Sequence, residues 1–110
     1  YSPTDDAFRE LPRGGPALGV VPDAAFAETV ARLGPGEVLL LGTDGIWEAA
    51  DARGERFGKQ RMQDALARAV QAGADARGVA EAVLRAVAEH RGSAVQADDE
   101  TLVVVRRVPT

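Results

Sequence analysis

The sequence predicts an α+β domain, because its apolar pattern indicates two short strands and two amphipathic helices. Residues 38–41 and 101–105 are uninterrupted apolar runs of strand length. Residues 59–71 and 76–91 repeat apolar side chains at helical spacing. The chain has 110 residues, 45% hydrophobic and 27% charged, which suits one domain or part of one.

Both predicted strands are apolar without alternation. Residues 38–41 (VLLL) follow a Gly-Pro-Gly turn, and residues 101–105 (TLVVV) are rich in β-branched side chains. Such runs are typical of strands that are buried on both faces, so we expect both in the interior of a sheet.

The helices carry their own boundary signals. The apolar stripes consist of Met62, Leu66, Ala69 and Val70 in the first helix, and of Ala80, Val83, Leu84 and Val87 in the second. Asp75 is a predicted N-cap and Gly92 a predicted C-terminal stop of the second helix, with His90 capping its end. We expect a further helix to begin over residues 46–50.

The first third of the chain is less regular. It is rich in Pro and Gly, which favour turns. Residues 8–11 and 17–21 are predicted short strands. Residues 24–32 fit either a brief helix or an extended edge, and the pattern leaves both open.

Composition excludes several kinds of chemistry. The net charge is −4, from 13 Lys and Arg against 17 Asp and Glu, and no basic block is present, so nucleic acid and anionic membrane are not expected partners. The absence of Cys excludes disulfides, thiolate zinc sites and a Cys nucleophile. No apolar run nears the ~20 residues of a membrane span, no targeting peptide is visible, and we expect a cytoplasmic location.

The remaining titratable residues favour hard cations. His90 is the single histidine, and no G-x-S-x-G pattern accompanies it, which disfavours a Ser-His-Asp triad. A metal site would therefore consist mostly of carboxylates and water, as Mg²⁺, Mn²⁺ and Ca²⁺ prefer.

Acidic residues stand at one end of each predicted strand. Asp44 follows the first strand, and Asp98, Asp99 and Glu100 precede the second. We call these two groups of residues the acidic corners. If the strands pair antiparallel, Asp44 and Asp98 converge, and a divalent cation would offset the repulsion between them. Gly45 would then allow a tight turn and leave room for the cation. Taken singly, an Asp-Gly pair after a strand is more often a plain turn, and an Asp-Asp pair before a strand is more often a solvated loop.

Four sequence blocks together resemble the metal-dependent protein phosphatases (the PPM, or protein phosphatase 2C-like, family), in their bacterial SpoIIE/RsbU-like branch. The blocks are residues 15–20 (GPALGV), 33–49 (LGPGEVLLLGTDGIWEA), 54–58 (GERFG) and 98–104 (DDETLVV). The resemblance implies an αββα sandwich, in which two mostly antiparallel sheets are flanked by helix pairs. It also implies hydrolysis of phosphoserine or phosphothreonine on a protein.

The same resemblance assigns roles to particular residues. Asp44 and Asp98 match metal ligands of the family, while Gly45 and Asp99 are expected to support the site. Two Mn²⁺ or Mg²⁺ ions are implied, with at least one further ligand outside this chain. Their activated water is the nucleophile, so no catalytic side chain is expected here, and the substrate-binding residues are unknown.

One family feature has no counterpart. The first metal motif, an Asp-Gly pair in the N-terminal half of such domains, is absent, and Asp5-Asp6 lack the following Gly. We therefore expect residues 1–110 to be the C-terminal half of one PPM-type domain. The half alone should be inactive and should expose apolar faces that a further segment or partner covers.

The resemblance also implies partners. The expected substrate is a phosphorylated regulatory protein such as a STAS-domain anti-sigma-factor antagonist, and a sensory or regulatory domain is expected in the parent protein. The alternative is a catalytically inactive PPM-fold module that binds phosphoproteins. A haloacid-dehalogenase-type phosphotransferase is disfavoured, because that chemistry uses two Asp separated by one residue and Asp44 stands alone.

Three nearby side chains have a structural and a functional interpretation. Trp47 is a predicted core residue rather than a substrate platform, and Phe57 is the other aromatic residue near the site. Arg53 and Arg56 lie in a polar loop that is either plain surface or one wall of a substrate groove.

Overall fold

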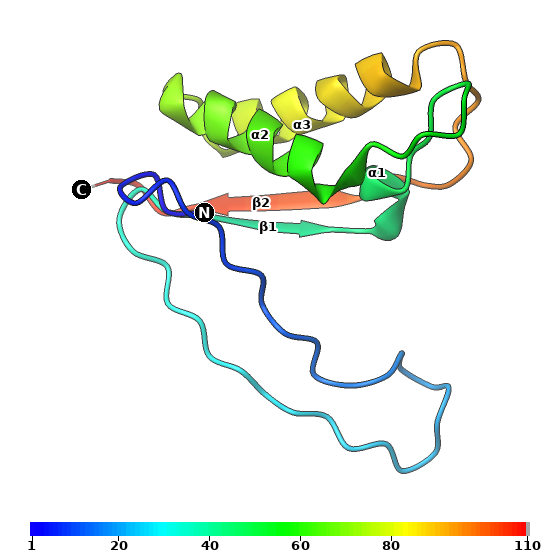
Figure 1. The fold of residues 1–110 in the computed structure, drawn as a ribbon. Coiled ribbons are helices and arrows are strands. Elements are labelled where there is room, and N and C mark those ends of the chain that lie inside the picture. The colour runs from blue at the N-terminus through cyan, green and yellow to red at the C-terminus, as the bar shows by residue number, and fades with distance from the viewer. Residues whose placement is uncertain (110) are drawn as a thin grey trace.

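Two strands form an antiparallel pair, and two long helices lie across one face of it (Figure 1). A computed structural model describes residues 1–109. The elements in chain order are β1 (Val38–Gly42), α1 (Asp44–Trp47), α2 (Gly58–Gln71), α3 (Ala76–Arg91) and β2 (Leu102–Arg106). The predicted α+β class is thus confirmed.

The strand register decides which loops meet. Val38 pairs with Arg106 at one end of the ladder, and Gly42 pairs with Leu102 at the other. Because β1 ends where β2 begins, the segment after β1 and the segment before β2 lie at the same end of the sheet.

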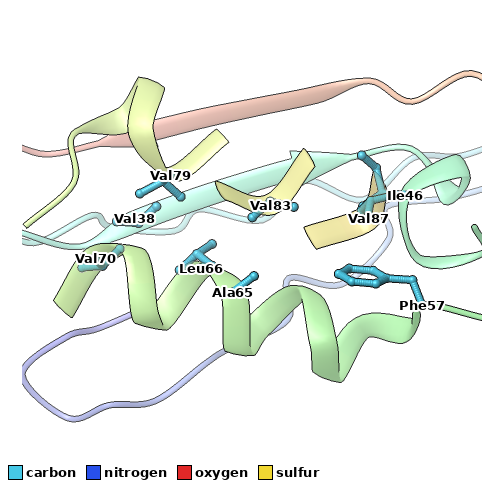
Figure 2. Packing of buried hydrophobic residues seen from close by; sticks show 9 residues of the cluster. All are labelled: Val38, Ile46, Phe57, Ala65, Leu66, Val70, Val79, Val83 and Val87. Carbon is cyan, nitrogen blue, oxygen red and sulfur yellow. The ribbon is translucent and has the colours of Figure 1, made fainter. Parts of the chain in front are cut away.

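The core lies between the sheet and the helices. Val38 of β1 is buried against α2 and α3 (Figure 2). Leu40, Leu102 and Val104 are partly buried and pack against the same cluster. The buried members are Val38, Ile46, Phe57, Ala65, Leu66, Val70, Val79, Val83 and Val87. One face of the sheet therefore carries the core of the described chain.

The opposite face of the sheet is apolar and open. Leu41, Val103 and Val105 alternate with the core-facing residues and are 53%, 49% and 45% exposed. The prediction that both strands are buried on both faces is therefore wrong for residues 1–109, because the helices cover one face alone. The expectation that an apolar face is left exposed is confirmed.

The helices follow their sequence signals closely. The Asp75 side chain accepts a hydrogen bond from the Gly78 amide at 2.8 Å, and Gly92 ends α3 with φ of 57°. The stripe of α2 packs into the core, and on α3 Val83 and Val87 are buried as expected. Leu84 of the predicted α3 stripe is instead 38% exposed, because α3 turns the face that carries Val79 towards α2 and the sheet. Among residues 1–109, no helix is both long and apolar enough to cross a membrane.

The short helix begins earlier than predicted. It spans Asp44–Trp47 rather than residues 46–50. The chain leaves helical geometry after Trp47, because the Phe57 amide bonds the Ala49 carbonyl and Ala50 forms a bridge with Arg56.

The two predicted N-terminal strands do not form. Residues 8–11 and 17–21 belong to a long excursion away from the sheet, and residues 24–32 contain no helix (Figure 1). Leu18 and Val30 in this excursion are 84% and 89% exposed. Apolar composition alone is insufficient here, because a strand needs a neighbour that satisfies its backbone groups.

We predict that Val83→Ala destabilises the domain by about 2 kcal/mol, because it removes buried methyl groups and leaves a cavity. Val83 is fully buried between α2 and the sheet. Urea denaturation followed by circular dichroism measures the change. Leu84→Ala, at the exposed neighbouring position on α3, is the matched control and should cost clearly less. Equal losses for the two variants would contradict this core.

Candidate functional site

The two acidic corners lie at the same end of the sheet, as the antiparallel hypothesis requires. The Thr43 amide donates to the Thr101 carbonyl at 3.1 Å, which extends the ladder by one pair beyond Gly42 and Leu102. Asp44 then begins α1, and Asp98 lies in the loop that leads into β2. Figure 1 shows α1 and this loop side by side.

Gly45 brings the two corners into direct contact. It is buried, and a Cβ placed on it would overlap the Asp99 carbonyl oxygen and lie 3.7 Å from the Asp98 Cβ. Gly45 is helical and has no positive φ, so the turn expected of it is not its role. Glycine is needed because the backbone before β2 approaches α1 too closely for any side chain.

Thr43 forms a second link that the sequence analysis missed. Its hydroxyl accepts a hydrogen bond from the Thr101 amide at 3.1 Å and donates to the Asp99 carbonyl at 3.4 Å. A hydroxyl residue between a strand and an Asp-Gly pair was the available signal. Thr43 thus holds the start of β2 against the residue that precedes Asp44.

The carboxylates at this end are exposed to solvent. Asp44, Asp98 and Asp99 all lie on the surface, and one Asp98 carboxylate oxygen accepts from the Asp99 amide at 2.7 Å. Hydrated carboxylates at this position are accessible to a cation and carry little desolvation penalty.

The donor set fits a hard divalent cation only in part. Asp44 and Asp98 offer carboxylate oxygens, which Mg²⁺ and Mn²⁺ prefer. Within residues 1–109, however, no three His, Asp or Glu side chains are grouped so that they could hold an ion by themselves. Ligation by Asp44 and Asp98, with support from Gly45 and Asp99, therefore stays a prediction that needs further ligands.

The last turn of α3 contacts both loops beside the acidic corners. Arg91 forms an ion pair with Glu100 at 2.6 Å. The His90 Nε2 atom lies 2.8 Å from the Glu55 carbonyl, and the ring packs edge-on against Phe57. His90 thus bonds a neighbouring loop, whereas the sequence predicted that it caps its own helix.

The loop between α1 and α2 has a defined internal turn. Both the Arg53 and the Glu55 amides donate to one Asp51 carboxylate oxygen at 2.9 Å. The Glu55 amide is the main reason that the pKa of Asp51 lies below its ordinary value, and the Arg53 amide adds to this.

The aromatic residues beside this loop serve packing. Trp47 packs against the core, as predicted, and Phe57 is buried in it. The Lys59 ammonium lies 5.3 Å from the centre of the Trp47 ring. Arg56 pairs with Glu48 at 3.4 Å on the surface. A substrate groove along this loop stays a prediction.

We predict that Gly45→Ala moves the residues before β2 and costs about 2 kcal/mol or more, because the new methyl group overlaps the Asp99 carbonyl. Gly54→Ala is the control. A methyl group there meets open space, and the substitution strains only the local backbone, which has a φ of +82°. Amide chemical shifts should change at Asp98 and Asp99 in the first variant alone. Unchanged shifts at both positions would contradict the close approach.

We predict that the loop over residues 51–56 loosens as the pH falls below about 4, because a protonated Asp51 carboxyl binds the two amides less well. A carboxyl whose pKa is lowered in the folded state stabilises the fold above its unfolded pKa of 3.8 and loses this effect on acidification. Hydrogen exchange of the Arg53 and Glu55 amides measures it. Asp51→Asn should weaken the pH dependence of exchange, and an unaltered dependence would refute this role.

Comparison with known proteins places the chain in a family. It matches the family described as Stage II sporulation protein E (SpoIIE) over residues 1–108. It is 30% identical over 93 residues to Protein IcfG of Synechocystis sp., a match that covers 84% of this chain and 14% of that relative. No solved structure matches the chain significantly. Since the family match spans nearly every residue, this chain belongs to the SpoIIE family of PPM-type phosphatase domains.

Proposed function

We propose that the chain forms part of a Mn²⁺- or Mg²⁺-dependent phosphatase that hydrolyses phosphoserine or phosphothreonine on a protein. The observation that carries the proposal is the antiparallel register of β1 and β2, which brings the Asp44 and Asp98 corners to one end of the sheet. Membership of the SpoIIE family supports the reaction class.

Asp44 and Asp98 would hold a divalent cation at this end. Such an ion supplies Lewis acidity, which lowers the pKa of a water molecule towards neutrality and offsets charge on the transferred phosphoryl group. Gly45 and Asp99 position the two ligands through their backbone contact. A side-chain nucleophile is not required, which agrees with a chain that has no Cys.

The remaining ligands and the second sheet are supplied by residues outside this chain. The open sheet face of Leu41, Val103 and Val105 supports this, because an apolar surface of this kind is normally covered. In our proposal, residues 1–110 are the C-terminal half of an αββα sandwich. The match covers only 14% of the length of the Synechocystis relative, which leaves room for sensory or regulatory domains in proteins of this kind.

The proposed substrate is a small phosphorylated regulator, such as a STAS-domain antagonist of an anti-sigma factor. Family membership is the support for this choice. The surface near the carboxylates also fits a protein substrate, since both Asp44 and Asp98 are exposed to solvent.

We predict that Asp44→Asn and Asp98→Asn each lower Mn²⁺-dependent hydrolysis by about a hundredfold or more in the full-length protein, because each removes a charged ligand. Turnover of a phosphoserine peptide is the measurement. Asp64→Asn, at an exposed position on α2, is the matched control and should keep wild-type turnover.

Near-normal turnover in either ligand variant would show that its residue is not a ligand. A wild-type protein that binds Mn²⁺ through both residues but hydrolyses no phosphopeptide would instead identify an inactive module that binds phosphoproteins.

A further inference from the structure

The ion pair between Arg91 and Glu100 joins the end of α3 to the entrance of β2. Arg91 is the last residue of α3, and Glu100 lies two positions after Asp98. The guanidinium and carboxylate are 2.6 Å apart, and their side chains are only 17% and 13% exposed. The other three ion pairs among residues 1–109 have side chains that are 44% exposed or more.

An ion pair this well buried mainly fixes the relative position of the two segments that it joins and adds little to stability. The desolvation penalty of the two charges offsets much of their attraction, so such a pair is weak evidence for stability. A short charge-assisted bond nevertheless restricts where the two backbones can lie relative to each other. Here it restricts the loop of residues 92–99 at its two ends.

Asp98 depends on this restriction, because its own hydrogen bonds are to residues close by in the sequence. Its backbone carbonyl accepts from the Gln96 side chain, and its carboxylate accepts from the Asp99 amide. Its neighbours supply the links to the rest of the fold, from Thr43 beside β1 to Asp99 and from Arg91 of α3 to Glu100.

We propose that Arg91 and Glu100 are a positioning pair that holds the Asp98 carboxylate in the place where it shares a divalent cation with Asp44. The inference rests on the proposed function, since it assumes that these two residues bind the cation. Removal of the pair should weaken cation binding, whereas turnover at saturating cation should change little.

The local charges dictate how the pair must be tested. Gly45, Glu48, Arg91, Asp98 and Glu100 all line a small cavity of about 110 Å³ beside the carboxylates. Loss of Arg91 alone would release Glu100 as a new acidic group next to Asp98, which would attract cations by itself. Both charges must therefore be removed together, so that the net charge of the site is unchanged.

The test is Mn²⁺ titration calorimetry on the full-length protein carrying Arg91→Met with Glu100→Gln. We expect Mn²⁺ to bind about tenfold more weakly, as is usual when a support of a metal ligand is lost. The kcat at saturating Mn²⁺ should stay within about twofold of wild type, because the chemistry itself is untouched.

Two further variants serve as controls. Lys59→Met with Glu10→Gln removes an exposed pair that ties α2 to the N-terminal segment, and it should leave Mn²⁺ affinity unchanged. Arg91→Lys retains the charge opposite Glu100 and should keep most of the wild-type Mn²⁺ affinity.

Unchanged Mn²⁺ affinity in the folded double variant would overturn the positioning role. If circular dichroism shows that this variant is unfolded, Arg91→Met with Glu100→Leu replaces the pair by apolar groups, which is often neutral for stability, and the same criterion applies. Asp44→Asn and Asp98→Asn are titrated in parallel. Wild-type binding by those two variants would refute the metal site itself, whereas their loss of binding beside an unaffected pair variant would refute the positioning role alone.

Discussion

The antiparallel pairing of β1 with β2 is the constraint on which the rest of the molecule depends. It joins residues from the middle and the end of the chain, and it provides the apolar surface on which α2 and α3 pack. The same register determines that the start of α1, directly after β1, and the loop before β2 share one end of the sheet. Because the proposed ligands lie in these two segments, the hydrophobic packing of the helices also maintains the acidic site.

The strand ladder brings the segments of Asp44 and Asp98 together, and short polar and steric contacts then fix their relative positions. Gly45 allows α1 to touch the Asp99 backbone, the Thr43 hydroxyl bonds the entrance of β2, and Arg91 holds Glu100 from α3. Each contact acts on a residue next to a carboxylate and leaves the carboxylate itself exposed. Such an arrangement suits acidic side chains that must keep their position while they remain accessible to a cation and a protein substrate.

The sheet and the acidic site are both incomplete in residues 1–109. The inner face is covered by α2 and α3, whereas the outer face exposes Leu41, Val103 and Val105. The acidic corners likewise offer two carboxylates where an ion needs more ligands. In the proposed sandwich, one further half of the domain supplies both the covering sheet and the remaining ligands, so a single physical cause accounts for both features.

Local sequence determined α2, α3 and the positions of β1 and β2, because helical spacing, the Asp75 cap, the Gly92 stop and the apolar runs act over neighbouring residues. It also indicated that Asp44 and Asp98 could meet, provided that the strands pair antiparallel. Tertiary structure decided that pairing, the open outer face and the absence of strands at residues 8–11 and 17–21, since strands form only where a partner satisfies their backbone groups. The contacts of Gly45 with Asp99 and of Arg91 with Glu100 likewise came from the fold, because each joins residues whose proximity has no local signal in the chain.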